Sequence, residues 1–433
     1  MSVPIPPGVF DLLPHVPEAP WKEVHLWQYV EKVARQIAQD YGFFEIRTPV
    51  FERAELFRRS VGDETDIVAK EMYLFQDRGG RELALRPEGT ASVIRALVQA
   101  QRFHPLLVQR YFYIAPMFRY ERQQAGRFRQ HHQFGVEVFG ISDPEQDAEI
   151  ISMLVQFYHR LGLSDIKVAL NSLGDLVCRT QFRDTFVQFL SRHVSDLSED
   201  SRRRFEKNPL RIFDSKDPRD QEILKNAPII IDFLRDEDRI HFERVQEALL
   251  DLNISFEISP RLVRGLDYYQ RTVFEIISGK LGAQNSIGGG GRFDGLLKQL
   301  GGPDLPSLGF GAGIERIIQV LVKEGQSRFI QQQLVNLVII PLDAYAKKRA
   351  FLLAESLRSY SVRVIVDFTN RKVKQSIASA VEAQAEWILV LGERELETDK
   401  GMLKYLPDGS SSEVSLSQID LFAHMVQSRS AQE

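Results

Sequence analysis

The last hundred residues of the chain alternate between short apolar runs and longer amphipathic runs, and this pattern constrains the fold more than any other. Runs rich in β-branched residues predict strands, and apolar residues at three- and four-residue spacing predict helices. Strands that alternate with helices form mostly parallel sheets, because each helix returns the chain to the same end of the sheet. The sequence therefore predicts a separate α/β domain with strands at 335–340, 362–366 and 387–391 and helices at 344–358 and 371–383.

The first 325 residues show a different order, in which several strands are adjacent in sequence. Aromatic and β-branched residues predict paired strands at 111–118 and 134–139, joined by a polar loop. Helical spacing predicts helices at 20–40 and 143–161. Strands joined by a hairpin pair antiparallel. The predicted organisation is a domain at 1–325 with a charged, mostly helical module inserted at about 174–255, a linker at 326–333 and the α/β domain at 334–433.

The composition is that of an ordinary globular protein of more than one domain. Of the 433 residues, 43% are hydrophobic and 26% charged. No apolar run approaches the ~20 residues of a membrane-spanning helix, and the N-terminus lacks the blocks of a signal peptide. Cys178 is the single cysteine, which excludes an intrachain disulfide and a cysteine-built metal site. We therefore expect a cytoplasmic protein with no membrane partner.

The net charge of −4 neither supports nor excludes an RNA partner. Phosphate binding needs only a local basic face, which the overall charge does not report. The arginine triplet at 202–204 is the densest basic run of the predicted helical module. We interpret it as a solvated helix face, with RNA contact as the alternative.

The segment 261–272 places a cation, a glycine, a carboxylate and two phenols within a few residues. An arginine and two hydrogen-bonding rings just before a predicted strand suit an anionic reaction centre beside a small polar ring. Taken alone, the segment fits a polar turn on a surface hairpin equally well. The groups concerned are those of Arg264, Gly265, Asp267, Tyr268 and Tyr269.

The loop of the predicted hairpin is rich in arginine. Residues 118–130 contain four arginines and one carboxylate, Glu121. The planar fork of donors on arginine matches phosphate oxygens, and a loop anchored by two strands can fold over a nucleotide. An exposed hairpin held by salt bridges is the alternative, which these residues alone favour slightly.

Residues 308–316 form a glycine-containing run that leads into a helix. The glycines are spaced GxGxG, which differs from the GxGxxG of dinucleotide-binding folds, and the chain contains no GxxxxGK phosphate loop. We interpret these glycines as positions where strand and helix pack closely, with Arg316 on the first helical turn directed at the sheet.

Residues 85–90 place an acid and a hydroxyl group at a turn that opens a predicted helix at 91–98. Glu88 is a candidate for capping the amide groups at the helix N-terminus. The same carboxylate is a candidate for binding the ammonium group of a substrate, and the sequence leaves both interpretations open.

Together these segments resemble the histidyl-tRNA synthetases, which are class II aminoacyl-tRNA synthetases, over nearly the full length of the chain. Three segments resemble the motifs shared by class II enzymes, namely 41–49, 118–121 and 309–316. More discriminating segments resemble the histidine-specific motifs, at 262–269 and 290–296, with further family matches at 65–68 and 208–212.

The resemblance implies a fold, a reaction and partners. The fold would be a class II α+β catalytic domain with an antiparallel sheet and an inserted helical module, followed by a smaller α/β domain similar to anticodon-binding domains. The reaction would be ATP-dependent activation of L-histidine to histidyl-adenylate and transfer to tRNA(His), with Mg²⁺ bridging the phosphates. A homodimer is also implied, because class II enzymes build an interface around the first motif, which contains Pro49 here.

The resemblance assigns ATP-binding roles to five residues. Arg119 would hold the α-phosphate and Glu121 the adenine amino group. Arg127 and Arg316 would hold the γ-phosphate end. His131 stands where the family has a phenylalanine that stacks on adenine. Because histidine is also flat, we expect altered ATP affinity without loss of function.

The implied histidine-binding residues surround a small polar ring. Glu137 and Tyr269 would read the two imidazole nitrogens, and such a buried site can discriminate by ~10⁴ without editing. Arg264 would neutralise charge at the α-phosphate and the histidine carboxylate. The α-ammonium group would be received by Glu88, Thr90 and Gln133. The complete predicted set is Glu88, Thr90, Gln133, Glu137, Arg264, Tyr268 and Tyr269, with Arg264, Arg119 and Gln133 as the catalytic residues.

Two further positions depart from the family pattern. Gln123 replaces a common proline of the second motif, and Phe293 replaces a tyrosine, which removes one hydroxyl group. Neither change removes a charged residue to which the resemblance assigns a role.

Catalytically silent relatives are the main alternative. One such paralogue is a regulatory subunit of the first enzyme of histidine biosynthesis and typically lacks the C-terminal α/β domain. Another is a regulatory domain within a longer kinase that senses uncharged tRNA. A plain RNA-binding protein on the same fold is a third possibility, but it leaves Glu88, Glu137 and Tyr269 unexplained.

Overall fold

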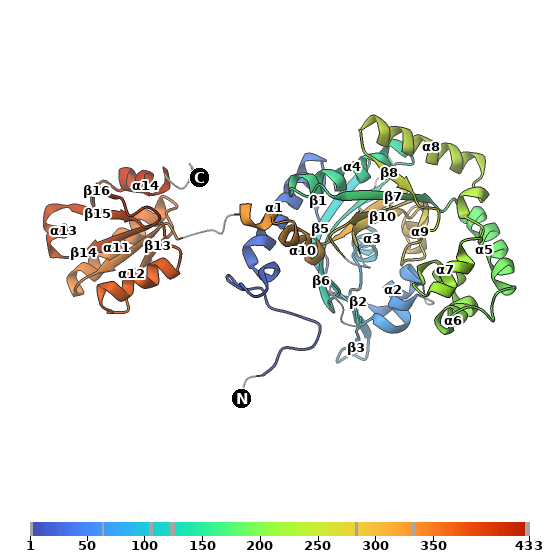
Figure 1. Cartoon of the computed structure of the whole chain (residues 1–433), viewed down its shortest axis with the longest axis horizontal. Helices are drawn as coiled ribbons and strands as arrows, with labels where there is room; N and C mark the ends of the chain where they lie inside the picture. The colour runs from blue at the N-terminus through green and yellow to red at the C-terminus, as the bar shows by residue number, and fades with distance from the viewer. Residues whose placement is uncertain are drawn as a thin grey trace. The chain divides into compact units, whose positions relative to one another are not determined.

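The computed structural model describes residues 3–62, 65–103, 107–121, 126–281, 285–330 and 335–428. The chain forms two compact units, Met1–Ile330 and Gln331–Glu433 (Figure 1). Gln123 lies outside the described residues. Gln326–Phe329, within the predicted linker, form the short 3-10 helix η5.

The larger unit is built on an eight-stranded, mainly antiparallel sheet. The strand order is β1-β5-β6-β11-β10-β9-β7-β8, with parallel pairs at its edges, between β1 and β5 and between β7 and β8. The predicted hairpin is confirmed as β5 and β6, and the expected α+β class is confirmed with it. The strands are β1 (Phe44–Glu45), β5 (Gln109–Phe118), β6 (Gln130–Phe139), β7 (Ile166–Ser172), β8 (Phe256–Ile258), β9 (Gln270–Ser278), β10 (Ser286–Arg292) and β11 (Ser307–Gly313).

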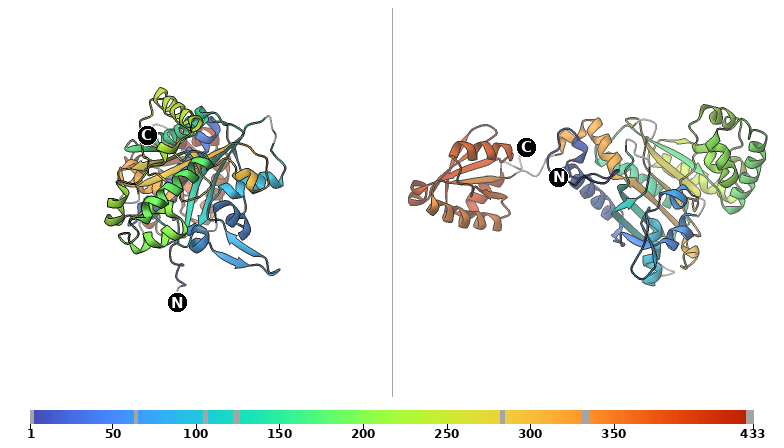
Figure 2. Two further views of the ribbon diagram at one scale, coloured as in Figure 1. Left: turned by 90° about the vertical axis from the view of Figure 1, so that its right-hand side faces the viewer. Right: turned by 90° about the horizontal axis from the view of Figure 1, so that it is seen from below.

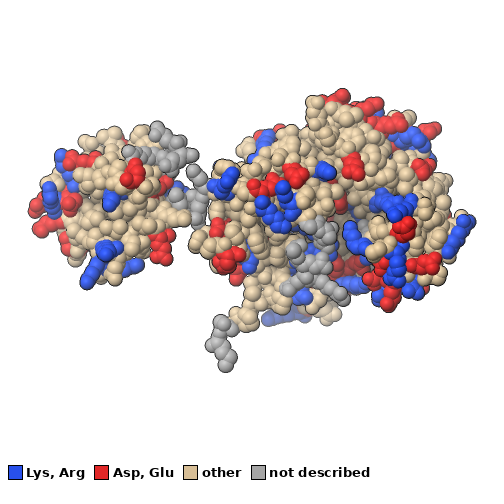
Figure 3. Space-filling view, viewed as in Figure 1, with Lys and Arg blue, Asp and Glu red and all other residues tan. Residues whose placement is uncertain are grey.

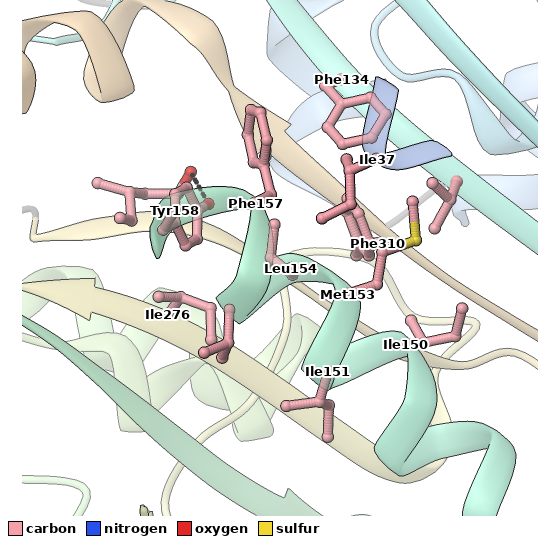
Figure 4. Close-up of a cluster of buried hydrophobic side chains, with 14 of the residues drawn as sticks. Ile37, Phe134, Ile150, Ile151, Met153, Leu154, Phe157, Tyr158, Ile276 and Phe310 are labelled. Atoms are coloured by element: carbon pink, nitrogen blue, oxygen red, sulfur yellow. Dashed lines mark hydrogen bonds between the residues drawn. The ribbon is translucent and has the colours of Figure 1, made fainter. Parts of the chain in front are cut away.

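Three helices cover one face of this sheet: α1 (Val24–Asp40), α4 (Pro144–Arg160) and α10 (Ile314–Lys323). The ring of Phe134 on β6 lies 5.1 Å from the ring of Phe157 on α4 and 5.5 Å from that of Phe310 on β11 (Figure 4). Tyr158 donates its hydroxyl hydrogen to the Ile287 carbonyl at 3.1 Å. Each fully buried apolar side chain of this layer contributes roughly 1.5–3 kcal/mol, so this face holds the main core.

The N-terminal segment differs from its prediction at two points. Pro20–Lys22 form a 3-10 turn, η1, and α1 begins only at Val24. The strand predicted within 41–49 shortens to the two residues of β1. Pro49 has no amide hydrogen for a strand ladder, and the carbonyls of Thr48 and Pro49 accept hydrogen bonds from Arg86 instead.

A module of helices is inserted between β7 and β8, at one end of the larger unit (Figure 2). Its core stacks the rings of Phe182, Phe186 and Phe213, with centres 4.5 to 6.2 Å apart. Arg202 and Arg203 are exposed, as predicted, whereas Arg204 is half-buried. The elements are α5 (Leu176–Ser191), α6 (Glu199–Lys207), η3 (Pro209–Asp214), α7 (Pro218–Leu224), η4 (Ile230–Phe233) and α8 (Asp236–Asp251).

A buried carboxylate, Asp220 of α7, joins three segments of this module. It accepts hydrogen bonds from the amide and hydroxyl of Ser198 and from the hydroxyls of Ser201 and Ser215, at 2.5 to 2.8 Å. Burial acts to raise the pKa of Asp220, but these bonds outweigh it and hold that pKa at about 2. The carboxylate is thus ionised and satisfied.

A smaller three-stranded sheet, ordered β2-β4-β3, lies beside the main one. Its strands alternate along the chain with short helices that flank the predicted site. The elements are β2 (Phe51–Arg53), α2 (Ala54–Val61), the π-helical turn η2 (Ile67–Glu71), β3 (Leu74–Gln76), β4 (Glu82–Leu85), α3 (Thr90–Gln99) and, after β10, α9 (Leu296–Gln299).

The smaller unit has a five-stranded sheet ordered β13-β12-β14-β15-β16. The three predicted strands pair in parallel, which confirms the α/β class, and an antiparallel pair extends the sheet. Lys and Arg side chains are interspersed with Asp and Glu on the side drawn in Figure 3. No helix among the described residues is long and apolar enough to cross a membrane. The elements are β12 (Leu337–Pro341), α11 (Ala344–Ser359), β13 (Val364–Val366), α12 (Val373–Glu382), β14 (Trp387–Leu391), α13 (Glu393–Thr398), β15 (Lys400–Tyr405), β16 (Ser411–Ser415) and α14 (Ile419–Ser428).

Candidate active site

The predicted site residues of β6 lie on the sheet face opposite to α1, α4 and α10. Successive side chains of a strand point to opposite faces, and in β6 the odd-numbered residues His131, Gln133 and Glu137 point away from these helices. Glu137 contacts Thr90 of α3 and lies next to Tyr113 of β5. Because His131 and Glu137 are six positions apart, the site extends about 20 Å along the strand.

Glycines of β11 form the floor of this face. A Cβ atom on Gly309 would lie 2.3 Å from Glu137 Oε2, so only glycine leaves room for that carboxyl group. A Cβ on Gly311 would lie 3.7 Å from Gln133 Cδ, and one on Gly313 would have no described atom within 4 Å. The predicted role of these glycines in helix packing is therefore wrong. Gly309 makes room for the Glu137 carboxyl group, and Gly311 lies beside Gln133.

Glu88 caps the N-terminus of α3, as one of its two interpretations predicts. Its Oε2 accepts from the Thr90 amide at 2.7 Å, and its Oε1 accepts from the Ala91 amide at 2.9 Å. Burial raises the pKa of Glu88, although these two amide groups oppose the shift. A carboxylate oxygen can accept a second hydrogen bond, so the cap leaves Glu88 able to bind a cation as well.

Glu137 is a buried carboxyl group with one paired and one unpaired oxygen. Its Oε1 accepts from Thr90 Oγ1 at 2.7 Å and, weakly, from the Tyr113 hydroxyl at 3.5 Å. Its Oε2 has no hydrogen-bond partner within the part of the chain that the structure describes. Burial raises the pKa of Glu137 well above its usual value. An unpaired buried group of this kind costs ~1–3 kcal/mol, which a ligand that donates to Oε2 would recover.

Tyr113 is a site residue that the sequence does not reveal. Its ring fits between two glycines, because a Cβ atom on either Gly89 or Gly135 would lie 2.3 Å from its Cζ. Gly135 pairs with Tyr113 across the hairpin, but Gly89 precedes α3 and is distant in sequence. Gly89 and Gly135 are the only features of the sequence that could have indicated a large side chain at this place. The fold is needed to show that both glycines make room for Tyr113.

Tyr268 and Tyr269 lie on the loop between β8 and β9. They line the end of the site that contains the Glu137 carboxyl group. Their ring centres are 4.8 Å apart and both side chains are buried. Burial raises the pKa of both hydroxyl groups, and the proximity of Glu137 adds to each shift. Arg264 of the same loop pairs with Glu275 of β9 and lies 5.7 Å from the ring centre of Tyr269. The loop thus places two phenols near Glu137 and a cation beside Glu275 and Tyr269.

Three arginines line the other end of the site. Burial, and after it the charge of Arg127, lower the pKa of Arg316. Cations that repel one another in this way are stabilised by an anion, so this end fits a phosphate chain. The orienting contacts are Arg119 Nε with the Pro87 carbonyl (2.8 Å), Arg127 Nε with Glu121 Oε2 (3.2 Å), and Arg316 with the carbonyls of Gly126 (3.2 Å) and Ser286 (2.7 Å).

Two described residues depart from the family pattern, and the surroundings of each suit the residue that this chain carries. Burial, followed by the charge of Arg119, lowers the pKa of His131 well below 6.5, so its ring is neutral at pH 7. A neutral imidazole can stack on a base much as phenylalanine does. Phe293 is buried with its ring centre 5.7 Å from that of Tyr268, edge to face. Its surroundings are apolar and do not require the missing hydroxyl.

Two buried charges outside the predicted set hold the site strands in place. Arg86 donates to the carbonyls of Thr48 (2.9 Å) and Pro116 (2.8 Å) and so ties the first predicted motif to β5. Glu315, at the start of α10, accepts from the His132 amide at 2.8 Å and contacts His132 Nδ1 at 2.9 Å. Neither contact has a local sequence signal.

One group of potential metal ligands lies outside this site, in the inserted module. Among the described residues this group consists of Asp175, Cys178 and Asp238. Their potential ligand atoms lie within 4.8 Å of one another. Arg235 already pairs with Asp175, and Arg271 pairs with Asp238 at 2.9 Å. Because the charges are compensated, we interpret this group as a structural network.

The chain matches known proteins over nearly its whole length. The profile of the family described as Histidyl-tRNA synthetase matches residues 15–317, and that of the Anticodon binding domain matches 336–422. A protein of Protochlamydia amoebophila named histidine–tRNA ligase is 49% identical over 419 residues, 97% of this chain and 99% of the relative. One of Bacillus cytotoxicus with the same name is 46% identical over 431 residues, 98% and 99% of the two chains. The crystal structure of apo S. aureus histidyl-tRNA synthetase is similar at a TM-score of 0.80 and 33% identity, covering 98% of this chain and 100% of that one.

Proposed function

The chain belongs to the histidyl-tRNA synthetase family, and from this membership and the site geometry we propose that it is a histidine–tRNA ligase. It activates L-histidine with ATP to histidyl-adenylate, releases pyrophosphate, and transfers the histidyl group to the 3′ end of tRNA(His). The observation that carries the proposal is the buried, half-paired carboxyl group of Glu137 beside Tyr268 and Tyr269.

Glu137 and Tyr269 recognise the imidazole ring. Imidazole carries one donor and one acceptor nitrogen when neutral, and Glu137 Oε2 lacks a donor among the described residues. Any side chain that cannot donate there leaves a buried group unpaired, which costs ~1–3 kcal/mol for each missing bond. Glu137 and the two phenols therefore select histidine, while Glu88, Thr90 and Gln133 receive its α-ammonium group.

In the first step a histidine carboxylate oxygen attacks the α-phosphorus of ATP. A carboxyl-to-phosphorus bond forms as the bond to pyrophosphate breaks, and pyrophosphate carries away the bonding electron pair. Arg119 and Arg264 stabilise the charge that develops on the α-phosphate. No side chain forms a covalent bond, so catalysis rests on positioning and charge neutralisation.

In the second step the terminal ribose hydroxyl of the tRNA attacks the activated carbonyl. The bond to AMP breaks, and a phosphate oxygen of the adenylate accepts the ribose proton. Arg264 keeps that phosphate oriented. Gln133, which lies over Gly311 between the two ends of the site, holds the α-ammonium group during both steps.

The arginine end receives ATP. Arg127 and Arg316 bind the terminal phosphates, His131 stacks on the adenine and Glu121 accepts from its amino group. Mg²⁺ would neutralise the phosphate chain when bound. Glu71 is a carboxylate near Arg119 and Arg127 at this end, and burial, followed by the charge of Glu121, raises its pKa. One or two carboxylates fit an ion that is held mainly by phosphates and water.

A homodimer is part of the proposal. Phe44 on the edge strand β1 is 72% exposed, and Phe51 and Phe75 of the small sheet are 53% and 41% exposed. An apolar patch along an unpaired sheet edge favours association with a second chain. Sedimentation equilibrium would give twice the chain mass, whereas a Phe44→Glu variant would shift toward monomer. A monomeric wild type would contradict this part.

The smaller unit binds the anticodon of tRNA(His), and the protein acts in the cytoplasm. The match of residues 336–422 to anticodon-binding domains supports the first statement. No residue of the unit is assigned to RNA contact.

ATP–pyrophosphate exchange with each of the twenty amino acids tests the proposal. Histidine should support exchange about 100-fold or more above every other amino acid. Folded protein that exchanges with none of them would contradict the proposal and favour a regulatory or RNA-binding paralogue.

A further inference from the structure

The loop that carries Arg264, Tyr268 and Tyr269 is held by side chains of the inserted module. The loop spans the residues between β8, which ends at Ile258, and β9, which begins at Gln270. The Ser259 amide donates to the Leu170 carbonyl of β7 at 2.8 Å, and no residue from 260 to 269 pairs in a strand ladder of the described sheet. Its backbone must therefore be fixed by other contacts.

Arg179 of α5 provides the first of these contacts. Its Nη1 donates to the carbonyl of Asp267 at 3.0 Å and to the carbonyl of Tyr269 at 2.8 Å. One guanidinium group thus fixes the peptide unit before Tyr268 and the peptide unit after Tyr269. Burial lowers the pKa of Arg179, against the charge of Asp267, which reflects how enclosed this contact is.

The segment 208–211 provides the second set of contacts. Nη2 of Arg211 donates to the Gly265 carbonyl at 2.6 Å, directly after Arg264 in the chain. Nδ2 of Asn208 lies 3.4 Å from both carboxylate oxygens of Asp267. Arg204 in turn donates to the Arg211 carbonyl at 3.0 Å. This segment matches the family in sequence, and its contacts give that match a physical reason.

The carbonyls of residues 265, 267 and 269 therefore all accept from the inserted module. Residue 265 adjoins Arg264, whose side chain pairs with Glu275. Residues 267 and 269 adjoin Tyr268, and the side chains of Tyr268 and Tyr269 lie near Glu137. A guanidinium group that fixes two carbonyls also fixes the directions of the neighbouring side chains. Small displacements of groups that bind a substrate change rates by about 100-fold.

We infer that Arg179, supported by Arg211, is a positioning residue for histidine recognition, through which the inserted module controls the loop 264–269. The inference rests on the proposed function, because it concerns the binding of histidine in that site. Arg264 lies on the same loop and acts on the α-phosphate in the proposed first step, but Arg119, Arg127 and Arg316, which bind ATP in the proposal, make no contact with Arg179 in the described structure. KM for ATP should therefore change much less than KM for histidine.

Histidine-dependent ATP–pyrophosphate exchange by the full-length protein tests the inference. Arg179→Gln should lower kcat/KM for histidine about 30- to 100-fold, with KM for ATP changed less than about threefold. Arg179→Lys keeps the charge but offers a single donor site, so it should recover about tenfold of the loss. Arg183→Gln is the matched control, because Arg183 is exposed on the same helix, and it should behave as wild type.

Thermal unfolding and calorimetric titration with histidine complete the test. Positioning predicts weaker histidine binding by Arg179→Gln and Arg211→Lys at an unfolding temperature near that of wild type. The inference is overturned by unchanged histidine kinetics in Arg179→Gln, or by equal losses for histidine and ATP that follow a lowered unfolding temperature. If wild type supports no exchange with any amino acid, the proposed function has failed first.

Discussion

The two units of the chain treat buried polar groups differently. In the larger unit, buried side chains include the carboxyl groups of Glu88 and Glu137 and the guanidinium group of Arg86. In the described part of the smaller unit, the buried polar side chains are those of Asn336, Ser376 and Tyr405, and no Asp, Glu, Lys, Arg or His is buried. Burying a charge costs free energy of folding unless the charge is paired. The larger unit bears this cost, and the described part of the smaller unit does not.

This difference locates the chemistry in the larger unit. Some of its buried charges are fully paired and structural, as with Asp220, whose two carboxylate oxygens both accept hydrogen bonds from serines. Glu137 is different, because one of its oxygens has no partner in the described structure. A half-paired buried carboxyl group beside two phenols is a candidate for binding a ligand.

The largest expected effect is that of Glu137→Gln. An amide donates where the carboxyl group accepts, so kcat/KM for histidine should fall about 10²–10³-fold in pyrophosphate exchange. Because burial raises the pKa of Glu137, its ionisation opposes folding as the pH rises above about 4.5. The variant should therefore unfold at the same temperature as wild type or a higher one at pH 7. Glu257→Gln, at an exposed position of β8, is the control, and equal activity of both variants would contradict the assigned role.

Removing the smaller unit should separate the two steps of the reaction. A chain that ends at Ile330 keeps every proposed site residue, so histidine-dependent exchange should stay within about threefold of wild type. Charging of tRNA(His) should fall about 100-fold or more, because the second contact with the tRNA is lost. Loss of exchange in a folded truncated chain would show that the larger unit does not activate histidine without the smaller one.

Asp220→Asn tests a paired buried charge in the same unit. The folded pKa of about 2 lies below the ordinary 3.8, so the carboxylate contributes about 2 kcal/mol of stability above pH 3.8. This contribution is lost as the pH falls from 3.8 toward 2. The variant should lose about 2 kcal/mol in urea unfolding at pH 7 and differ less from wild type at pH 2.5. An equal difference at both pH values would contradict the shifted pKa.

The smallest expected effect is that of His131→Phe. Phenylalanine retains a flat ring without a polar edge, so KM for ATP should fall about two- to fivefold.

In wild type, KM for ATP should stay constant from pH 6 to pH 8, because the lowered pKa keeps His131 neutral throughout. A steep change of KM through pH 6.5 that the variant lacks would show that the ring titrates there.

Local patterns predicted the elements, and short motifs supplied the candidate site residues, whose roles stay predictions. The β5–β6 hairpin and the three parallel strands of the smaller unit follow from periodicity. Arg264, Tyr268 and Tyr269 come from one contiguous segment, and the structure does bring that segment to Glu137.

Contacts between distant segments were not predictable in the same way. Arg179 and Tyr269 are 90 positions apart, and a side chain that donates to a backbone carbonyl requires no particular residue type at the acceptor. Gly89 makes room for Tyr113 for a reason that only the packing shows. β1 is short because Pro49 and the contacts of Arg86 compete with strand pairing.

Charging of tRNA(His) transcripts with labelled histidine by the purified full-length protein tests the account most directly. The account predicts that histidine is transferred to tRNA(His), that no other amino acid is, and that Glu137→Gln reduces the rate along with exchange. A wild-type protein that folds and binds tRNA but transfers no histidine would contradict it.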